Sequence, residues 1–257
     1  MDLIELENAV GSIADGIITL TLNRPDKRNA LSMGLMQDVT RIVQELAYRD
    51  DARVMVVQGA GRSFCAGFDV SQAAEHPSNR AEWLSSRTLS GMMDTIKAAP
   101  VVKIAAIQGH AMGAGMGIAL ACELRYATES AVFGLPELNF GIPYSYGATH
   151  GLVRVIGLTR AAEMILTCRT VDAALALDWG LITGVMTAAD TLETEVRSLA
   201  ASLAQVPAVL LLSSQTFLDE AATALVPNGA KNIAATMLAR RDPEATFTRT
   251  NYVRKFS

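Results

Sequence analysis

Glycines are concentrated in the stretch GHAMGAGMGIALACE, residues 109–123, where they occupy positions 109, 113, 115 and 117. Glycine loses more conformational entropy on ordering than any other residue, so this density indicates that bare backbone is needed there. The stretch joins two apolar runs, which predicts a buried strand, a turn at Gly113-Ala114-Gly115 and a helix. The first N–H groups of a helix lack intrahelical partners and carry the positive end of its dipole. The turn is therefore suited to facing a developing negative charge, although close packing of a helix on a strand would use the same glycines.

A second loop, RSFCAGFDV at residues 62–70, also follows an apolar run and offers exposed N–H groups around Gly67-Phe68. Two such loops on neighbouring parallel strands can each direct one N–H at the same oxygen. That arrangement is an oxyanion hole, in which each donor contributes about 3 kcal/mol in a dry site. The two loops together favour chemistry at a carbonyl.

The glycine spacing argues against nucleotide sites. A dinucleotide fingerprint requires GxGxxG and an acidic residue about 20 positions later, whereas the spacing here is Gly113-x-Gly115-x-Gly117. The chain also contains no GxxxxGK[ST] phosphate loop. A dinucleotide-dependent oxidoreductase is therefore a distant alternative.

The amino-acid composition excludes several other classes of protein. Of the 257 residues, 50% are hydrophobic and 19% charged, enough for a sizeable core, and the net charge of −4 argues against a nucleic-acid-binding surface. Cys65, Cys122 and Cys168 form no CxxC pair, which predicts neither a disulfide framework nor a zinc site and favours a reducing, cytoplasmic compartment. The N-terminus does not resemble a signal peptide. Residues 104–122 carry no charge, but Gln108 and His110 in their middle argue against a membrane span.

The order of elements predicts an α/β protein. Strands joined by a turn at residues 14–16 precede a helix over 31–50 capped by Ser32, a strand over 53–61, a helix over 80–100 and a strand over 101–109. This alternation implies βαβ units on a parallel sheet. From residue 189 the pattern is helical. We therefore expect an α/β core over residues 1–189 and a helical C-terminal region over 190–257.

Five motifs occur in the order and spacing of the crotonase superfamily, the enoyl-CoA hydratase/isomerase family, which the chain resembles over nearly its full length. The motifs are NRPDKRNALS, RSFCAGFDV, IAAIQGHAMGAGMGIALACELRYA, AVFGLPELNFGIP and TCRTVDAALALDWGLITGV. The resemblance implies a crotonase-like (ClpP/crotonase) spiral of ββα units. It also implies an acyl-CoA substrate, no metal, no cofactor other than the CoA of the substrate, and a homotrimer or homohexamer.

The resemblance assigns the hole donors to the amides of Phe68 and Ala114 and an acid–base role to Glu137. A second catalytic glutamate of the family falls at Gly117, so the chain looks like a one-carboxylate member. Hydration of a 2-enoyl thioester usually uses two glutamates, whereas a Δ3,Δ2 double-bond shift needs one base and the hole. An isomerase is therefore favoured over a hydratase. A decarboxylase, a thioester hydrolase and a catalytically weak acyl-CoA-binding protein remain alternatives.

The resemblance also implies a CoA-binding surface with local cations at Arg24, Lys27 and Arg28, and a C-terminal region that covers CoA and forms the trimer. The residues expected to bind substrate or CoA are Arg28, Ala30, Ala66, Phe68, Asp69, Val70, Ser71, Gly113, Ala114, Gly117, Tyr144 and Tyr146.

The sequence leaves the roles of two further sets of side chains undecided. Tyr144, Ser145 and Tyr146 replace a small, glycine-rich loop of hydratases and either donate to the substrate or only shape the pocket. Trp83 and Met92 either line an apolar acyl tunnel or pack in the core.

Overall fold

The computed structural model describes residues 2–69, 79–140, 148–223 and 243. Its largest feature is a seven-stranded sheet with the strand order β1-β2-β3-β4-β5-β7-β10. The strands from β3 to β10 run parallel to their neighbours, as predicted, and β1, β2 and β3 pair antiparallel. The strands are β1 (Asp2–Glu5), β2 (Ala9–Ala14), β3 (Ile17–Leu22), β4 (Val54–Gly59), β5 (Val102–Ile107), β7 (Leu124–Thr128) and β10 (Gly184–Met186).

The turn between β2 and β3 lies where the sequence predicts it. Asp15 and Gly16 both have positive φ, 51° and 78°, and Ala14 pairs with Ile17. A two-residue turn with this geometry matches the twist of an antiparallel pair, and Asp-Gly suits it. The prediction of strands joined at residues 14–16 is confirmed.

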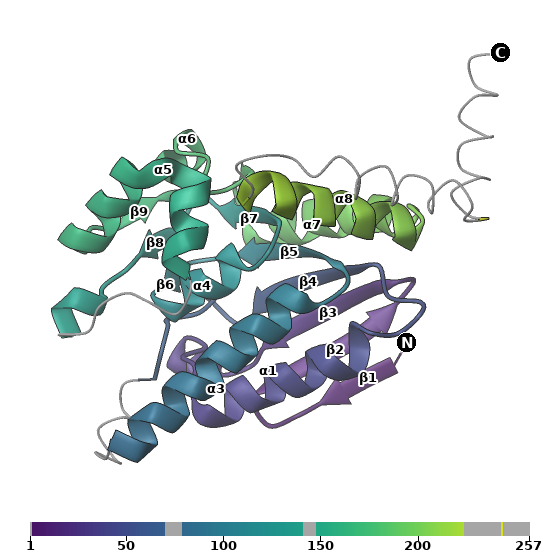
Figure 1. Cartoon of the computed structure of the whole chain (residues 1–257), viewed down its shortest axis with the longest axis horizontal. Coiled ribbons are helices and arrows are strands. Elements are labelled where there is room, and N and C mark those ends of the chain that lie inside the picture. Colours follow the sequence, from purple (N-terminus) through teal and green to yellow (C-terminus); the bar gives the residue numbers. More distant parts are fainter. Residues whose placement is uncertain (1, 70–78, 141–147, 224–242, 244–257) are drawn as a thin grey trace.

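Two long helices cover one face of the sheet. α1 (Met33–Leu46) begins at Ser32, whose side chain accepts a hydrogen bond from the Leu35 N–H, so the predicted cap is confirmed. α3 (Asn79–Ala98) packs beside α1 on the same side of the sheet (Figure 1). Between these helices and the sheet lies the main hydrophobic core, which contains Met92 with no exposed surface. Met92 is therefore a core residue.

The central strands are buried on both faces, as their continuous apolar sequences require. In β4, Met55 and Val57 belong to the main core, whereas Val54 and Val56 belong to a second cluster under α7 (Ala189–Ala204). α8 (Ala208–Thr223) follows, and its Gln215 side chain donates to a main-chain oxygen beside β5. α7 and α8 confirm the predicted helical pattern from residue 189 as far as Thr223, and the predicted division of the chain at residue 189 stays a prediction.

A small second sheet stands beside the carboxyl ends of the parallel strands. It consists of β6 (His110–Met112), β8 (Val132–Gly134) and β9 (Val171–Asp172), in the order β6-β8-β9. The sequence analysis did not predict it, because strands of two or three residues are too short to show alternation. The remaining elements are η1 (Pro25–Lys27), α4 (Ala114–Leu120), η2 (Glu137–Phe140), α5 (Ala148–Thr167) and α6 (Ala173–Asp178).

The uncharged stretch over residues 104–122 is divided among β5, β6 and α4 rather than forming one helix. Of the helices within the described residues, none alone is long and apolar enough to cross a membrane. α7 and α8 meet that criterion only as a pair bent by 108°.

Candidate active site

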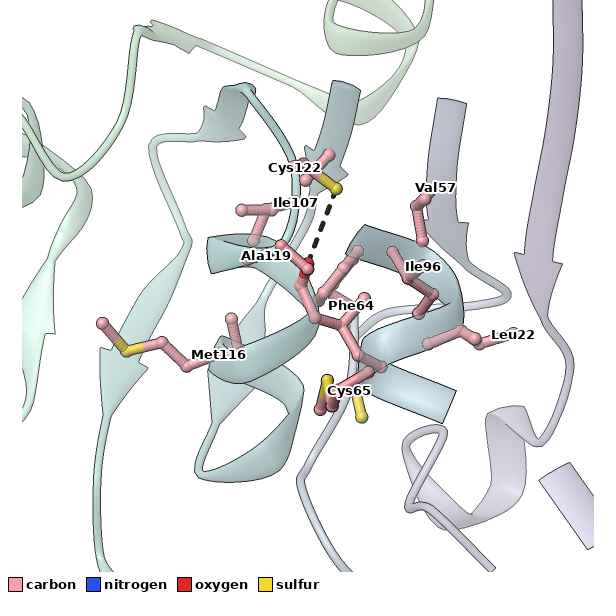
Figure 2. Packing of buried hydrophobic residues seen from close by; sticks show 14 of the residues in the cluster. Leu22, Val57, Phe64, Cys65, Ile96, Ile107, Met116, Ala119 and Cys122 are labelled. Atoms are coloured by element: carbon pink, nitrogen blue, oxygen red, sulfur yellow. Dashed lines mark hydrogen bonds between the residues drawn. The ribbon is translucent and has the colours of Figure 1, made fainter. Parts of the chain in front are cut away.

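The two glycine-rich loops meet. The loop after β4 runs alongside β6, where the Cys65 N–H donates to the His110 carbonyl at 2.9 Å. The Cys65 carbonyl in turn accepts from the Met112 N–H at 3.0 Å, which completes a parallel bridge between Cys65 and Ala111. Figure 2 shows Phe64 and Cys65 of this loop in the same buried cluster as α4. The loop over residues 62–69 and the turn over 113–115 are therefore held in register.

Two glycines permit this contact. A Cβ at Gly67, where φ is 92°, would lie 2.8 Å from the Met112 oxygen and 3.6 Å from the Ala114 nitrogen. A Cβ at Gly115 would lie 2.5 Å from the Cys65 oxygen. Both distances to oxygen are shorter than real side chains tolerate, so bare backbone is required at both positions. Gly115 thus serves close packing, and Gly67 brings its loop against the start of α4.

The structure leaves two amides available at this contact. Leu31 bonds to both neighbours of Phe68, because its N–H donates to the Gly67 carbonyl and its own carbonyl accepts from the Asp69 N–H. In such a parallel bridge the N–H of the middle residue, Phe68, points to the opposite side. Ala114 is the first residue of α4, so its N–H has no intrahelical acceptor. No described residue accepts a hydrogen bond from either amide.

Glu137 is the acidic group beside this turn. It is the first residue of η2 and is only 8% exposed. A Cβ at Gly113 would lie 2.7 Å from its Oε1 atom, so the carboxyl group packs directly on the turn. Its Oε2 atom is buried and has no hydrogen-bond partner among the described residues. The Gly113 N–H donates to the Gly134 carbonyl, which joins the turn to β8, the strand that leads to Glu137.

The electrostatics of Glu137 suit proton transfer. Burial raises the pKa of its carboxyl group above the ordinary value because desolvation disfavours the charged form, and its own backbone amide partly opposes this. A carboxylate with an unused oxygen and a raised pKa accepts a proton more readily than an exposed one. Glu137 and the two amides therefore combine a base with donors for an oxyanion.

The predicted CoA-binding loop borders the same site. Lys27 and Arg28 are exposed, and the Arg28 carbonyl accepts from the Ala66 N–H at 2.9 Å. Arg24 differs from the expectation of a phosphate-facing cation. Its guanidinium forms an ion pair with Asp69 at 2.9 Å and also donates to the Ala30 carbonyl.

Other predicted residues are only partly placed. Gly117 is buried within α4, and Trp83 is 57% exposed near the start of α3. The predictions for Val70, Ser71, Tyr144, Ser145 and Tyr146, and for the C-terminal segment after residue 223, lie outside the described residues. Among the described residues, no three His, Cys, Asp or Glu side chains gather as a metal site would require.

The sequence analysis missed Asn29. It has no exposed surface and a positive φ of 56°, and its amide group donates to main-chain carbonyls of Ala60 and Ser63 at 2.9 and 2.8 Å. An Asn that follows Lys27 and Arg28 in a loop tolerates left-handed backbone, but the distant acceptors of its Nδ2 group leave no local signal in the sequence.

The family model described as enoyl-CoA hydratase/isomerase matches residues 12–241. The chain belongs to this family. It is 34% identical over 206 residues to "Probable enoyl-CoA hydratase echA8" of Mycobacterium tuberculosis, covering 80% of this chain and 76% of that protein. It is 37% identical over 177 residues to "Enoyl-CoA isomerase/hydratase fer4" of Mycosarcoma maydis, covering 65% of this chain and 64% of that protein.

Solved structures agree on the fold. The enoyl-CoA hydratase of Bacillus anthracis superposes with a TM-score of 0.92 at 26% identity, covering 97% of each chain. The enoyl-CoA hydratase of Mycobacterium smegmatis superposes with a TM-score of 0.90 at 25% identity, also covering 97% of each chain. The predicted α/β crotonase fold and membership of the crotonase superfamily are therefore confirmed.

Proposed function

We propose that this enoyl-CoA hydratase/isomerase family member is an enoyl-CoA isomerase that shifts a double bond from Δ3 to Δ2 through a thioester enolate. The observation that carries the proposal is Glu137, a buried carboxyl group with a free oxygen, packed on the turn that presents the Ala114 amide. The proposed substrate is a 3-enoyl-CoA, and no metal or separate cofactor takes part.

In the proposed reaction the Glu137 carboxylate takes a proton from C2 of the substrate. The electron pair of the broken C–H bond moves into conjugation with the thioester, whose oxygen becomes negatively charged. The amides of Phe68 and Ala114 donate hydrogen bonds to that oxygen and lower the energy of the dienolate. Glu137 then returns the proton to C4, which leaves the double bond between C2 and C3.

The preference for isomerisation rests on Gly117. Sequence resemblance assigns a second catalytic glutamate of the family to this position, and Gly117, buried in α4, supplies no carboxylate there. Hydration needs a group to hold and deprotonate water as well as one to protonate carbon, whereas the double-bond shift returns the same proton. One relative described above is named a hydratase and the other an isomerase/hydratase, so hydration is the competing activity that must also be measured.

We also propose that the acyl-CoA lies along Arg28 to Ala30, Ala66 and residues 68–71. The C-terminal region over 190–257 would cover CoA and join copies into a homotrimer or homohexamer. Light scattering of the purified protein, with and without an acyl-CoA, tests the assembly. A monomer at micromolar concentration would contradict it.

The decisive experiment compares purified wild type with Glu137→Gln on a 3-enoyl-CoA. We expect the variant to form 2-enoyl-CoA at least about 100-fold more slowly, the usual contribution of a positioned base. Glu129→Gln is the matched control, because Glu129 is exposed on the turn before β8. Equal rates for wild type and Glu137→Gln would make Glu137 structural and refute the isomerase proposal.

A second variant addresses hydration. Gly117→Glu places a carboxylate where the family carries its second glutamate, and we expect hydration of a 2-enoyl-CoA to rise above the wild-type level. If wild type already hydrates 2-enoyl-CoA faster than it isomerises 3-enoyl-CoA, the hydratase alternative is correct. Binding of acyl-CoA without turnover of either substrate would favour the binding-protein alternative.

A further inference from the structure

Asn29 connects the predicted CoA-binding loop to the loop that carries Phe68. We propose that Asn29 is a positioning residue whose carboxamide fixes the direction of the Phe68 amide toward the substrate oxygen. This inference rests on the proposed oxyanion hole and adds to it a residue that does not touch the substrate.

The contacts of Asn29 use both ends of its carboxamide. Its Oδ1 atom accepts from the Arg24 N–H at 2.8 Å, within its own loop. Its Nδ2 atom donates across to the other loop, to the carbonyls of Ala60, Ser63 and Phe64 at 2.9, 2.8 and 3.2 Å. Since two N–H bonds serve three oxygens, the longest contact shares a hydrogen with a shorter one.

The main chain of Asn29 is fixed by the same two loops. Its carbonyl accepts from the Cys65 thiol at 3.1 Å. Its φ of 56° is left-handed, a conformation that Asn adopts more readily than most side chains. Asn29 therefore fixes the position of the loop over residues 24–30 relative to the segment over residues 60–65.

From that point the hydrogen bonds lead directly to Phe68. The Ala66 N–H donates to the Arg28 carbonyl, and the Leu31 N–H donates to the Gly67 carbonyl, on either side of Asn29 in the chain. The Leu31 bridge then decides which side the Phe68 N–H faces. The position of Leu31 follows from where residues 28–30 are held, so loss of the Asn29 side chain would tilt the donor.

Asn is the side chain that these contacts require. Asp has the same size but no N–H to donate, so it would place a carboxylate against three carbonyl oxygens. Gly adopts the left-handed conformation without strain but forms none of the side-chain bonds. Asn29→Asp and Asn29→Gly therefore both remove the Nδ2 hydrogen bonds, and only Asp keeps an oxygen that accepts from the Arg24 N–H.

The test must separate positioning from stability. An arylacryloyl-CoA is a suitable probe, because hydrogen bonds at its thioester oxygen polarise the conjugated system and shift its absorption to longer wavelength. The spectra are recorded in a Glu137→Gln background, in which the proposed base is absent and the probe stays intact. Ser32→Ala is the control, because it removes the cap of α1 three residues away and lies outside this network.

We expect the parent and Ser32→Ala to give the full red shift at saturating probe, and both Asn29 variants to bind the probe with a reduced shift. With Glu137 intact, we expect kcat of the Asn29 variants to fall by up to about 100-fold, as small misplacements of reacting groups can cost that much. KM should change far less than kcat. The pH at which the rate rises should not move, because Glu137 is unchanged.

The outcomes are distinct. A folded Asn29→Asp or Asn29→Gly with the full red shift would overturn the inference and leave the proposed function standing. No shift in the parent would refute the oxyanion hole, and the inference with it. Arg24→Lys keeps the main-chain N–H that donates to Asn29 but removes guanidinium hydrogen bonds to the Ala30 carbonyl and to Asp69, so it loosens the same loop without changing Asn29. A full shift in Arg24→Lys, together with Asn29 variants that do not fold, would show that the loop does not set the direction of the Phe68 amide and would overturn the proposal.

Discussion

The carboxyl end of the large sheet and the face of the sheet under α7 are packed in different ways. Near the carboxyl end, the loop over residues 62–69, the turn over 113–115 and Glu137 are packed so closely that glycines are required. On the α7 face, aliphatic side chains such as Val56, Ala106 and Val196 form an ordinary apolar cluster. A cavity of about 480 Å³ opens beside this cluster, between the sheet and α7.

The difference lies in unused hydrogen-bonding capacity. The loop corner contains two amides and one buried carboxyl oxygen that have no hydrogen-bond partner among the described residues, an arrangement that costs stability unless a ligand completes it. The cavity beside α7 has a charged rim that includes Glu193 and Arg197, which are exposed and form an ion pair with each other. The proposed chemistry therefore depends on buried groups that lack a described partner, and the α7 face offers no such arrangement among the described residues that line its cavity.

Gly113→Ala should have the largest effect on activity. The new Cβ would lie 2.7 Å from the Glu137 Oε1 atom, on a residue whose φ is 52°. Either the carboxyl group or the Ala114 amide must move, and loss of one hole donor alone costs about 100-fold to 1,000-fold in kcat. The rate of 3-enoyl-CoA isomerisation measures this. Gly91→Ala, with open space around its Cβ position, is the control, and a Gly113→Ala enzyme within twofold of wild type would contradict the site geometry.

Leu192→Ala should instead reduce stability without changing the chemistry. Leu192 is 3% exposed in the cluster beneath α7, far along the chain from either loop. Truncating a buried Leu typically lowers the free energy of unfolding by about 2–5 kcal/mol. Urea denaturation measures that loss, and kcat per folded molecule should match wild type. A drop in kcat at temperatures where the variant is folded would show that the two regions are coupled.

Gly115→Ala should reduce both the free energy of unfolding and the isomerisation rate, because Gly115 packs against the loop that carries the proposed donor Phe68. Its Cβ would lie 2.5 Å from the Cys65 oxygen and 2.7 Å from the Cys65 Cβ. Overpacking of this kind costs about 1–3 kcal/mol, and relief requires α4 to move away from the loop that carries Phe68. The free energy of unfolding, measured by urea denaturation, and the isomerisation rate should both decrease. An unchanged rate in a destabilised variant would mean that the donors are not tied to this contact.

The long periodic elements could be read from the sequence. Ser32 with its apolar spacing fixes the start of α1, and continuous apolar runs identify β4 and β5. Such patterns are local, and burial of one stripe or of both faces produces them directly. The sheet of β6, β8 and β9 could not be read, because its short strands exist only through pairing with segments distant in the chain.

The need for bare backbone at the glycines was predictable, but the contacts that impose this need were not. The glycine spacing correctly indicated that bare backbone is needed. Nothing in the sequence near Gly67, however, predicts that the Met112 oxygen lies beside it. The role proposed for Glu137 came from family resemblance, because a Pro-Glu dipeptide alone does not reveal burial. The acceptors of the Asn29 Nδ2 group, Ala60 and Ser63, lie more than 30 residues away along the chain, and such long-range contacts leave no periodic pattern in the sequence.

A further effect should appear in the pH dependence of stability. Burial raises the pKa of folded Glu137, so this residue favours the folded state below its unfolded pKa of about 4.3. That contribution is lost as the pH rises through the raised folded pKa. Glu137→Gln should therefore be more stable than wild type at pH 8, and the advantage should shrink on acidification. Denaturation curves across this range measure it, and a difference that grows toward acid would contradict the desolvation of Glu137.

Arg197→Ala should have the smallest effect. Arg197 lines the cavity beside α7, but its side chain is 75% exposed and its ion pair with Glu193 is a helical pair on the surface. Exposed pairs of this kind contribute below about 1 kcal/mol, so unfolding should change little and the isomerisation rate not at all. Enlarging the cavity entrance in this way also tests whether its volume matters. If turnover or affinity for acyl-CoA fell in Arg197→Ala, the α7 face would take part in function, and the separation of the two regions would be wrong.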